Sequence, residues 1–422
     1  MLRRTFLATT GATLSLPGFA QFRVEISGVG ATQLPIAIAR FRGEDPAMPL
    51  SAIVRADLER SGLFRAADPG VAQDETAAPA FPDWRGRAVD ALVGGSVAKL
   101  ADGRFDVRFK LWDVVKGADL GGQSNAVAPA DLRLAAHRIA DWVYEKLTGE
   151  KGVFSTRIAY VVKAGSRYTL RVADADGENA QVALASPEPI ISPAWSPDGR
   201  QLAYVSFESQ KAVVWAQDVA TGRRRKIADF RGSNSAPAWS PDGRTIAATL
   251  SRDGGSQLYA LGVNGENPRR LTSSSAIDTE PIYSADGRSI YFVSDRGGGP
   301  QIYRMPAAGG AVERVTFAGS YNISPSLSPD GRLLAYVNRS NGNTFRVMVL
   351  DLGSAGASPQ PATDTSEDEH PSFAPNGRLL VYATRSQGHD VLMTTTVDGK
   401  IKARLASPAA DVREPAWGPY GR

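Results

Sequence analysis

The 422-residue sequence contains no cysteine and only three histidines. The lack of cysteine excludes disulfides, thiol nucleophiles and cysteine-ligated metals. A Ser–His–Asp triad would have to use His137, His370 or His389. We expect His137 on the surface of a helix and the other two in loops far apart in the sequence, which argues against such a triad.

Other signatures of enzymes are also missing. The nucleophile elbow G-x-S-x-G is absent, since residues 94–98 (GGSVA) fail at the last position. The string 28–30 (GVG) lacks the third glycine of a dinucleotide-binding loop. Where Asp-Gly recurs, no tryptophan follows at the spacing of a sialidase Asp-box. We therefore expect no enzymatic activity, no catalytic residue, no cofactor and no resident metal.

Strong charge and long apolar runs are missing too. The net charge is +4, and no stripe of Lys and Arg with interleaved aromatics is present, so nucleic acid is not an expected partner. After the first twenty residues, no stretch reaches the ~20 apolar residues that cross a bilayer. We expect no membrane span in the mature chain.

Residues 1–20 have the features of an export signal. Arg3 and Arg4 are followed by a modestly apolar core and a small-x-small cleavage site at 18–20 (GFA). The string 3–7 (RRTFL) also fits the twin-arginine pattern, which favours that route over the general one. The expected compartment is the periplasm.

An eight-residue pattern repeats six times at a spacing of 44 to 46 residues. Its copies are 193–200 (PAWSPDGR), 237–244 (PAWSPDGR), 281–288 (PIYSADGR), 325–332 (PSLSPDGR), 371–378 (PSFAPNGR) and 415–422 (PAWGPYGR). Several short alternating segments follow each copy except the last. A period of this size with several strands per unit predicts the blades of a β-propeller.

Each copy predicts a strand and a tight turn. In 196–199 (SPDG), Ser, Pro and Gly occupy the positions that a type I turn favours, so the repeated Asp is interpreted as a turn residue. The first blade, from residue 157, has no motif of its own, whereas the last motif ends the chain. We therefore expect the C-terminal strand to complete the first blade of a six-bladed propeller over 155–422, which removes two open sheet edges. We also expect a monomer.

Residues 34–150 predict a small N-terminal α/β domain. Strands are expected at 34–41, 90–99, 104–115 and 120–127, helices at 50–63 and 130–147, and a long surface loop at 66–85. The preceding segment 21–33 begins with alternating apolar residues Phe22, Val24 and Ile26. It could form an edge strand of this domain or extend the sheet of a partner, and the sequence leaves both open.

Two sets of propeller loops should emerge on one face. Loops from strand four to the next strand one end in the residues before the motif prolines: Ser192, Ala236, Glu280, Ser324, His370 and Glu414. Loops from strand two to strand three carry Lys163, Lys211, Arg252, Arg296, Arg339 and Arg385. An inner ring with acids inside a basic ring suits a charged protein surface. A cation at the channel mouth, held by Glu280, Glu414 or Asp278, is a further hypothesis.

The whole mature chain resembles the TolB family. An export signal, a short α/β domain, the junction 145–149 (EKLTG) to 154–162 (FSTRIAYVV) and six units ending in PAWGPYGR carry the resemblance. It implies a non-enzymatic periplasmic component of the Tol–Pal system. Such a component would bind TolA and the lipoprotein Pal, and would support outer-membrane integrity and invagination during cell division.

The resemblance also implies where the partners bind. It places TolA recognition at Phe22, Val24 and Ile26. It places Pal on the loop face, at Ser233, Asn234, Ala236, Thr279 and Glu280. The two sets of loop residues described above add His370, Glu414, Arg252, Arg296, Arg339 and Arg385 to the expected Pal-binding surface. The alternative from another class is a periplasmic propeller hydrolase or sugar-processing enzyme, with a cluster of acids inside the channel.

Overall fold

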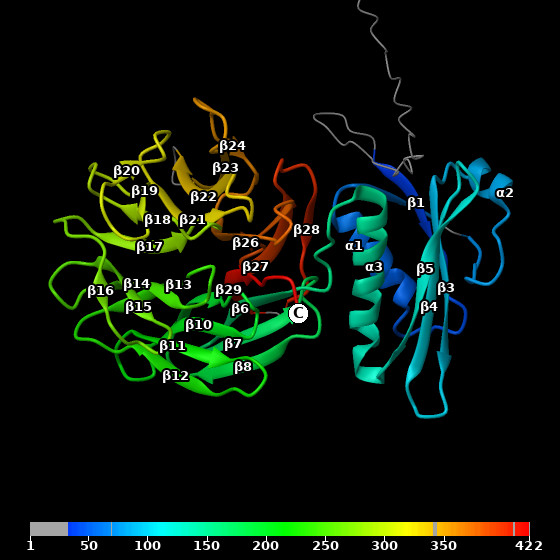
Figure 1. Cartoon of the computed structure of the whole chain (residues 1–422), viewed down its shortest axis with the longest axis horizontal. Coiled ribbons are helices and arrows are strands. Elements are labelled where there is room, and N and C mark those ends of the chain that lie inside the picture. The colour runs from blue at the N-terminus through cyan, green and yellow to red at the C-terminus, as the bar shows by residue number, and fades with distance from the viewer. Residues whose placement is uncertain (1–32, 69, 341–343, 408–409, 422) are drawn as a thin grey trace, which may run out of the picture.

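The computed structural model describes residues 33–68, 70–340, 344–407 and 410–421. An N-terminal α/β domain stands beside a ring of six four-stranded sheets (Figure 1). This confirms the predicted combination of an α/β domain and a six-bladed propeller. Phe22, Val24 and Ile26, together with the expected export signal, lie outside the described residues.

The α/β domain contains one five-stranded sheet in the order β2-β1-β3-β4-β5. Strand β1 runs parallel to β2 and β3, and the other pairs are antiparallel. Helices α1 and α3 lie between the sheet and the propeller (Figure 1). The elements are β1 (Leu34–Ile38), α1 (Leu50–Arg60), β2 (Phe64–Ala67), α2 (Phe81–Gly86), β3 (Ala91–Lys99), β4 (Phe105–Asp113), β5 (Ala118–Val127), the 3₁₀ turn η1 (Pro129–Asp131) and α3 (Leu132–Thr148).

Two expectations for this domain are wrong. The segment 66–85, expected to be a loop, contains the end of β2 and most of α2. These elements are too short to show a hydrophobic period, and Trp84 anchors α2 by burial against β3 and β4. His137, expected on the helix surface, is 0% exposed. Helix α3 is covered on two sides, by the sheet and α1 and by the propeller, so its buried face is wider than one stripe.

The six blades surround a central channel. Their strands, from the innermost outwards, are β9 (Ile190–Trp195), β10 (Gln201–Ser206), β11 (Val213–Asp218), β12 (Arg224–Ala228); β13 (Asn234–Trp239), β14 (Thr245–Leu250), β15 (Gln257–Gly262), β16 (Arg269–Arg270); β17 (Asp278–Tyr283), β18 (Ser289–Ser294), β19 (Gln301–Pro306), β20 (Glu313–Arg314); β21 (Asn322–Leu327), β22 (Leu333–Ser340), β23 (Thr344–Asp351), β24 (Gln360–Pro361); β25 (Glu369–Phe373), β26 (Leu379–Ser386), β27 (His389–Thr396), β28 (Lys402–Arg404); and β29 (Asp411–Trp417), β6 (Arg157–Ala164), β7 (Arg167–Asp174), β8 (Gln181–Ser186).

The ring closes through the C-terminal strand, as predicted. Strand β29 pairs antiparallel with β6, for example Val412 with Val162. Trp417 is 7% exposed, and its indole N–H donates a hydrogen bond to Thr156 Oγ1 at 2.8 Å. Burial of this aromatic side chain therefore stabilises the junction between the two ends of the propeller chain.

The repeated motif forms the predicted turns and also joins the blades. In the first copy, Gly199 N–H donates to Ser196 O at 2.9 Å, and the Asp198 carboxylate accepts from Ser196 Oγ at 2.6 Å. The Asp therefore acts within its own turn. Trp195 and Trp239 reach the previous blade: Trp195 Nε1 donates to Ala416 O at 3.0 Å, and Trp239 Nε1 donates to Ala194 O at 3.1 Å. Among the described residues, no helix is long and apolar enough to cross a membrane.

Candidate functional site

The innermost strands line a channel cavity of about 480 Å³. Strands β9, β13, β17, β21, β25 and β29 contact one another in turn around it. The residue before each motif proline lines this cavity, and the set is Ser192, Ala236, Glu280, Ser324, His370 and Glu414. The structure thus brings together six residues that lie far apart in the sequence. We refer to them as the channel ring.

All six residues of the channel ring have a left-handed backbone, with φ between 46° and 56°. Each innermost strand also shifts its pairing register at this point. A side chain in this region costs roughly 1–3 kcal/mol per residue, and such bulges re-aim side chains. Sequence reasoning missed this conformation, and it corrects one expectation: the ring lies within the strands, lining the channel, and not at the ends of the loops.

Two glutamates of the channel ring bridge neighbouring blades. Glu280 Oε2 accepts a hydrogen bond from the Ser324 backbone N–H at 2.6 Å. Glu414 Oε2 accepts one from the Ser192 N–H at 3.1 Å. Strands β17 and β29 lie opposite each other in the ring of six, so the two carboxylates make the same contact on opposite sides of the channel.

His370 lies between these carboxylates in the ring. Its Nε2 is 3.3 Å from Glu414 Oε2, and its Nδ1 is buried with no hydrogen-bond partner among the described residues. Burial opposes protonation, but the charges of Glu414 and Glu280 outweigh it and raise the pKa of His370. Burial also raises the pKa of Glu280, although the charge of His370 opposes that shift. The channel therefore favours a protonated histidine beside the glutamates.

Asp278 does not belong to the channel ring. Its side chain is buried and accepts two hydrogen bonds from Arg296 Nη2, at 2.9 and 3.0 Å. Arg296 is therefore held by an acid of its own blade. Among the described residues, the acids and histidines grouped closely enough to share one ion are Asp57, His137 and Asp176, outside the channel. A cation held by Glu280 and Glu414 stays a prediction. Asp278 is not one of its expected ligands, because Arg296 already binds its carboxylate.

The remaining arginines form a partly exposed rim on the loop face. The guanidinium of Arg252 lies 4.6 Å from the ring centroid of Phe230, and that of Arg339 lies 4.6 Å from that of Tyr321. Arg252 also pairs with Asp253, Nε to Oδ1 at 3.5 Å. Stacking leaves the other N–H groups at the edge of a guanidinium able to point towards a ligand. Arg385 is exposed, with Nη1 4.0 Å from Asp390 Oδ1. The sequence predicted these cations but not the aromatic rings beneath them.

Asn234, expected to bind a partner, is completely buried, so that expectation is wrong. Its amide Nδ2 donates to the carbonyl oxygens of Ala212, Phe230 and Gly232 at 3.0 to 3.2 Å. Its Oδ1 accepts from Phe230 N–H at 3.0 Å. The side chain thus holds the loop before β13 in shape, which is why it faces inwards.

The position of Asn234 recurs in other blades, and sequence reasoning missed it. Buried Asp278, Asn322 and Asp368 also stand three residues before a motif proline. Asn322 donates to Ala318 O at 2.9 Å, and Asp368 accepts from Thr365 Oγ1 at 2.5 Å. The sequence does contain a signal for this position, namely an Asn or Asp three residues before the repeated proline in four of the six units.

The other predicted residues of this face lie near its surface. Ser233 is exposed, and its backbone N–H donates to Ser251 Oγ at 2.7 Å. Thr279 Oγ1 is 3.3 Å from Thr249 Oγ1. Two adjacent loops of the same face expose Ile277 (55%) and Phe317 (73%), which the sequence analysis did not select. The guanidinium of Arg314 lies 5.2 Å from the ring centroid of Phe317. An exposed aromatic ring with a stacked arginine is typical of protein-binding surfaces.

Comparison with known proteins covers both parts of the chain. Residues 22–120 match the family model described as the TolB amino-terminal domain, and residues 144–421 match the TolB beta propeller domain. A protein of Polaromonas sp. (strain JS666) named Tol-Pal system protein TolB is 68% identical over 422 residues, covering 100% of this chain and 98% of the relative.

Two further similarities also extend over most of the chain. A protein of the same name from Aromatoleum aromaticum is 67% identical over 422 residues, covering 99% of this chain and 98% of the relative. A crystal structure of TolB from Acinetobacter baumannii superposes with a TM-score of 0.83 at 39% identity, covering 92% of this chain and 97% of that chain. The chain therefore belongs to the TolB family of Tol–Pal system proteins.

Proposed function

We propose that this protein is a non-enzymatic, periplasmic binding component of the Tol–Pal system that links TolA to the outer-membrane lipoprotein Pal. In that role it would contribute to outer-membrane integrity and to invagination of the membrane during cell division. The observation that carries the proposal is the similarity, over the whole chain, to proteins named Tol-Pal system protein TolB.

The loop face supports binding of Pal. Arg252 and Arg339 are preorganised by the rings beneath them, so less conformational entropy is lost when a carboxylate binds. Phe317 supplies exposed apolar area on the same face. A partner with acidic groups around an apolar patch would match this surface.

The histidines support a role without catalysis. His137 pairs with Asp57 but is fully buried, and His389 is exposed beside Asp411. His370 faces Glu414 in the channel. Among the described residues, no serine hydroxyl is hydrogen-bonded to any of these rings, so the nucleophile–base contact that a serine hydrolase needs has no support.

For TolA, we propose the segment 21–33. Its alternating Phe22, Val24 and Ile26 suit addition of a strand to a partner's sheet. Deletion of residues 21–30 is expected to abolish TolA binding and to leave the melting temperature of the propeller nearly unchanged. Full TolA affinity of the deleted protein would move the site elsewhere.

The Pal proposal is tested with the mature chain and the soluble domain of Pal by titration calorimetry. The double variant Arg252→Glu and Arg339→Glu reverses two rim charges and is expected to weaken binding about tenfold or more. Arg288→Glu is the matched control, since Arg288 is an exposed arginine of a motif turn on the opposite face. If the double variant bound Pal as tightly as the parent and Arg288→Glu lost Pal binding, Pal would bind the opposite face.

A further inference from the structure

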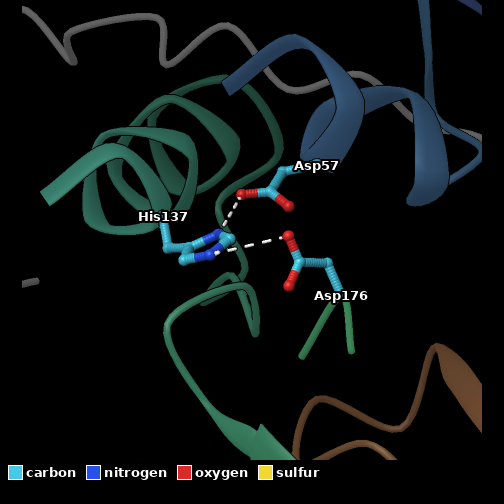
Figure 2. Close-up of side chains that lie close together, drawn as sticks. All are labelled: Asp57, His137 and Asp176. Carbon is cyan, nitrogen blue, oxygen red and sulfur yellow. Dashed lines mark hydrogen bonds and ion pairs between the residues drawn. The ribbon is translucent and has the colours of Figure 1, made fainter. Parts of the chain in front are cut away.

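A second polar cluster lies where the α/β domain meets the first propeller blade, outside the channel and the loop face. Helix α3 contributes Arg133 and His137, one turn apart. Helix α1 contributes Asp57, whose carboxylate faces the His137 ring (Figure 2). Asp174 at the end of β7 and Asp176 in the following turn face them from the propeller. We refer to these five residues as the joint cluster.

His137 is the centre of the joint cluster. Its Nδ1 is 2.6 Å from Asp57 Oδ2, and its Nε2 is 3.8 Å from both Asp174 Oδ2 and Asp176 Oδ2. The ring is fully buried, and its Nε2 has no hydrogen-bond partner among the described residues. The imidazole thus stands between one carboxylate of its own domain and two of the propeller.

The charges around His137 do not balance without it. Arg133 pairs with both Asp174 and Asp176, and on α1 Arg60 Nη2 contacts Asp57 Oδ1 at 2.5 Å. Arg157 also interacts electrostatically with Asp174, and Asp141 on α3 interacts with Asp57. Four carboxylates against three guanidinium groups leave one negative charge in a buried place, which a protonated imidazole would neutralise. The Asp141 carboxylate itself accepts hydrogen bonds from the backbone N–H groups of residues 154 and 155, at 2.7 and 3.1 Å.

A divalent metal ion fits the joint cluster less well than a proton does. Asp57 already occupies the Nδ1 side of the ring, so a metal would have to bind Nε2 together with Asp174 and Asp176. Arg133 holds both of those carboxylates, and a cation would have to displace it. The geometry therefore favours charge on the imidazole itself.

We propose that His137 is protonated in the assembled protein and that this buried charge holds the α/β domain against the first blade, so that loss of the proton loosens the joint. Burial alone would disfavour the charged ring, but the hydrogen bond and charge of Asp57, with Asp176 and Asp174, raise the pKa of His137. The joint is then tight below the ordinary histidine pKa of about 6.5 and loosens as the pH rises through the raised value.

The packing beside the cluster leaves room for such movement. A cavity of about 390 Å³ lies between α3 and the propeller, lined by Leu134, Asp174 and Trp195 among others. The two parts are therefore not packed tightly together along their whole contact, and much of the specific contact at this place consists of charged groups. Interfaces of this kind between domains commonly permit relative motion.

The first measurement follows the proton itself by NMR of the histidine rings. The chain has three histidines, so His137→Gln, His370→Gln and His389→Gln each assign one signal. The His137 signal is expected to titrate above the ordinary histidine pKa of about 6.5. Asp57→Asn should shift its midpoint downwards. A His137 ring that is already neutral at pH 6 would overturn the proposal.

The second measurement is the distance between spin labels on the α/β domain and on the propeller. Because the chain has no cysteine, Val115→Cys and Val182→Cys can carry spin labels on the α/β domain and on β8, where both native side chains are 58% exposed. The distance distribution is expected to broaden between pH 6 and pH 9. The distance distribution of His137→Gln should be broad at both pH values. The distribution of His389→Gln should change with pH as in the parent protein. In Asp57→Asn the charges of the joint cluster balance when the His137 ring is uncharged. Its distance distribution should therefore stay narrow at both pH 6 and pH 9.

Two outcomes would contradict the coupling of proton and joint. One is a distance distribution that does not change between pH 6 and pH 9 although the His137 signal has titrated. The other is a distribution at pH 8 that zinc chloride narrows in the parent but not in His137→Gln, since this would mean that the cluster takes a metal ion instead of a proton.

Discussion

The Glu280 carboxylate accepts a hydrogen bond from the backbone N–H of Ser324 at 2.6 Å, and both residues occupy the same place in adjacent blades. The same relationship links Glu414 to Ser192 across the closure of the ring. These contacts tie the strained strands of four blades into two pairs. Glu280 and Glu414 are therefore parts of the scaffold as well as of the channel surface.

Replacement of Glu280 tests this structural role. Glu280→Ala removes the acceptor of the Ser324 N–H and is expected to lower the free energy of unfolding by about 1–3 kcal/mol, as for an unpaired polar group. Glu280→Gln keeps an oxygen in the same place and should retain most of the stability. Chemical denaturation measures both variants, and an equal loss in the two would mean that the charge, not the hydrogen bond, stabilises the ring.

The pH dependence of stability should change when His370 is removed. Because Glu414 and Glu280 raise the pKa of His370, its protonated form stabilises the fold fully below about pH 6.5. That contribution disappears as the pH rises through the raised pKa. His370→Gln is expected to flatten the fall in melting temperature above pH 6.5. His389→Gln removes an exposed histidine of the same propeller and serves as the comparison variant.

Trp417 should be essential for closing the ring. Trp417→Ala removes a buried indole and its hydrogen bond to Thr156, with an expected cost of roughly 3–5 kcal/mol. Deletion of residues 415–422 should lower the melting temperature further, since it also opens two sheet edges. Phe317→Ala, at a position 73% exposed, should change the stability by less than about 0.5 kcal/mol. Melting curves that coincide for the truncated and full mature chains would contradict closure by β29.

Replacement of Asn234 tests whether the buried Asn or Asp three residues before a motif proline stabilises the preceding loop. Asn234→Ala leaves three carbonyl oxygens and one backbone N–H without their side-chain partner, and we expect a loss of about 2–4 kcal/mol. Ser233→Ala, at the exposed neighbouring position, should have little effect on stability. If Asn234→Ala weakened Pal binding but melted like the parent, Asn234 would be a contact residue after all.

The sequence by itself determined the number of blades, the turns and the closure of the ring. Each of these depends on residues close together in the chain or on counting repeats: Ser196, Asp198 and Gly199 form a turn that needs no distant partner. The missing motif before residue 157 and the surplus one at 415–422 indicated the shared blade without any coordinates.

Only the tertiary structure decided which side chains are buried, paired or aimed at the channel. His137 has a surface position by helix period alone, and it is buried because Asp57 and the first blade close over it from two directions. The channel ring points inwards because a left-handed residue shifts the register of each innermost strand. Such features arise from contacts between segments separated by tens to hundreds of residues. Local propensity and hydrophobic period do not report such contacts.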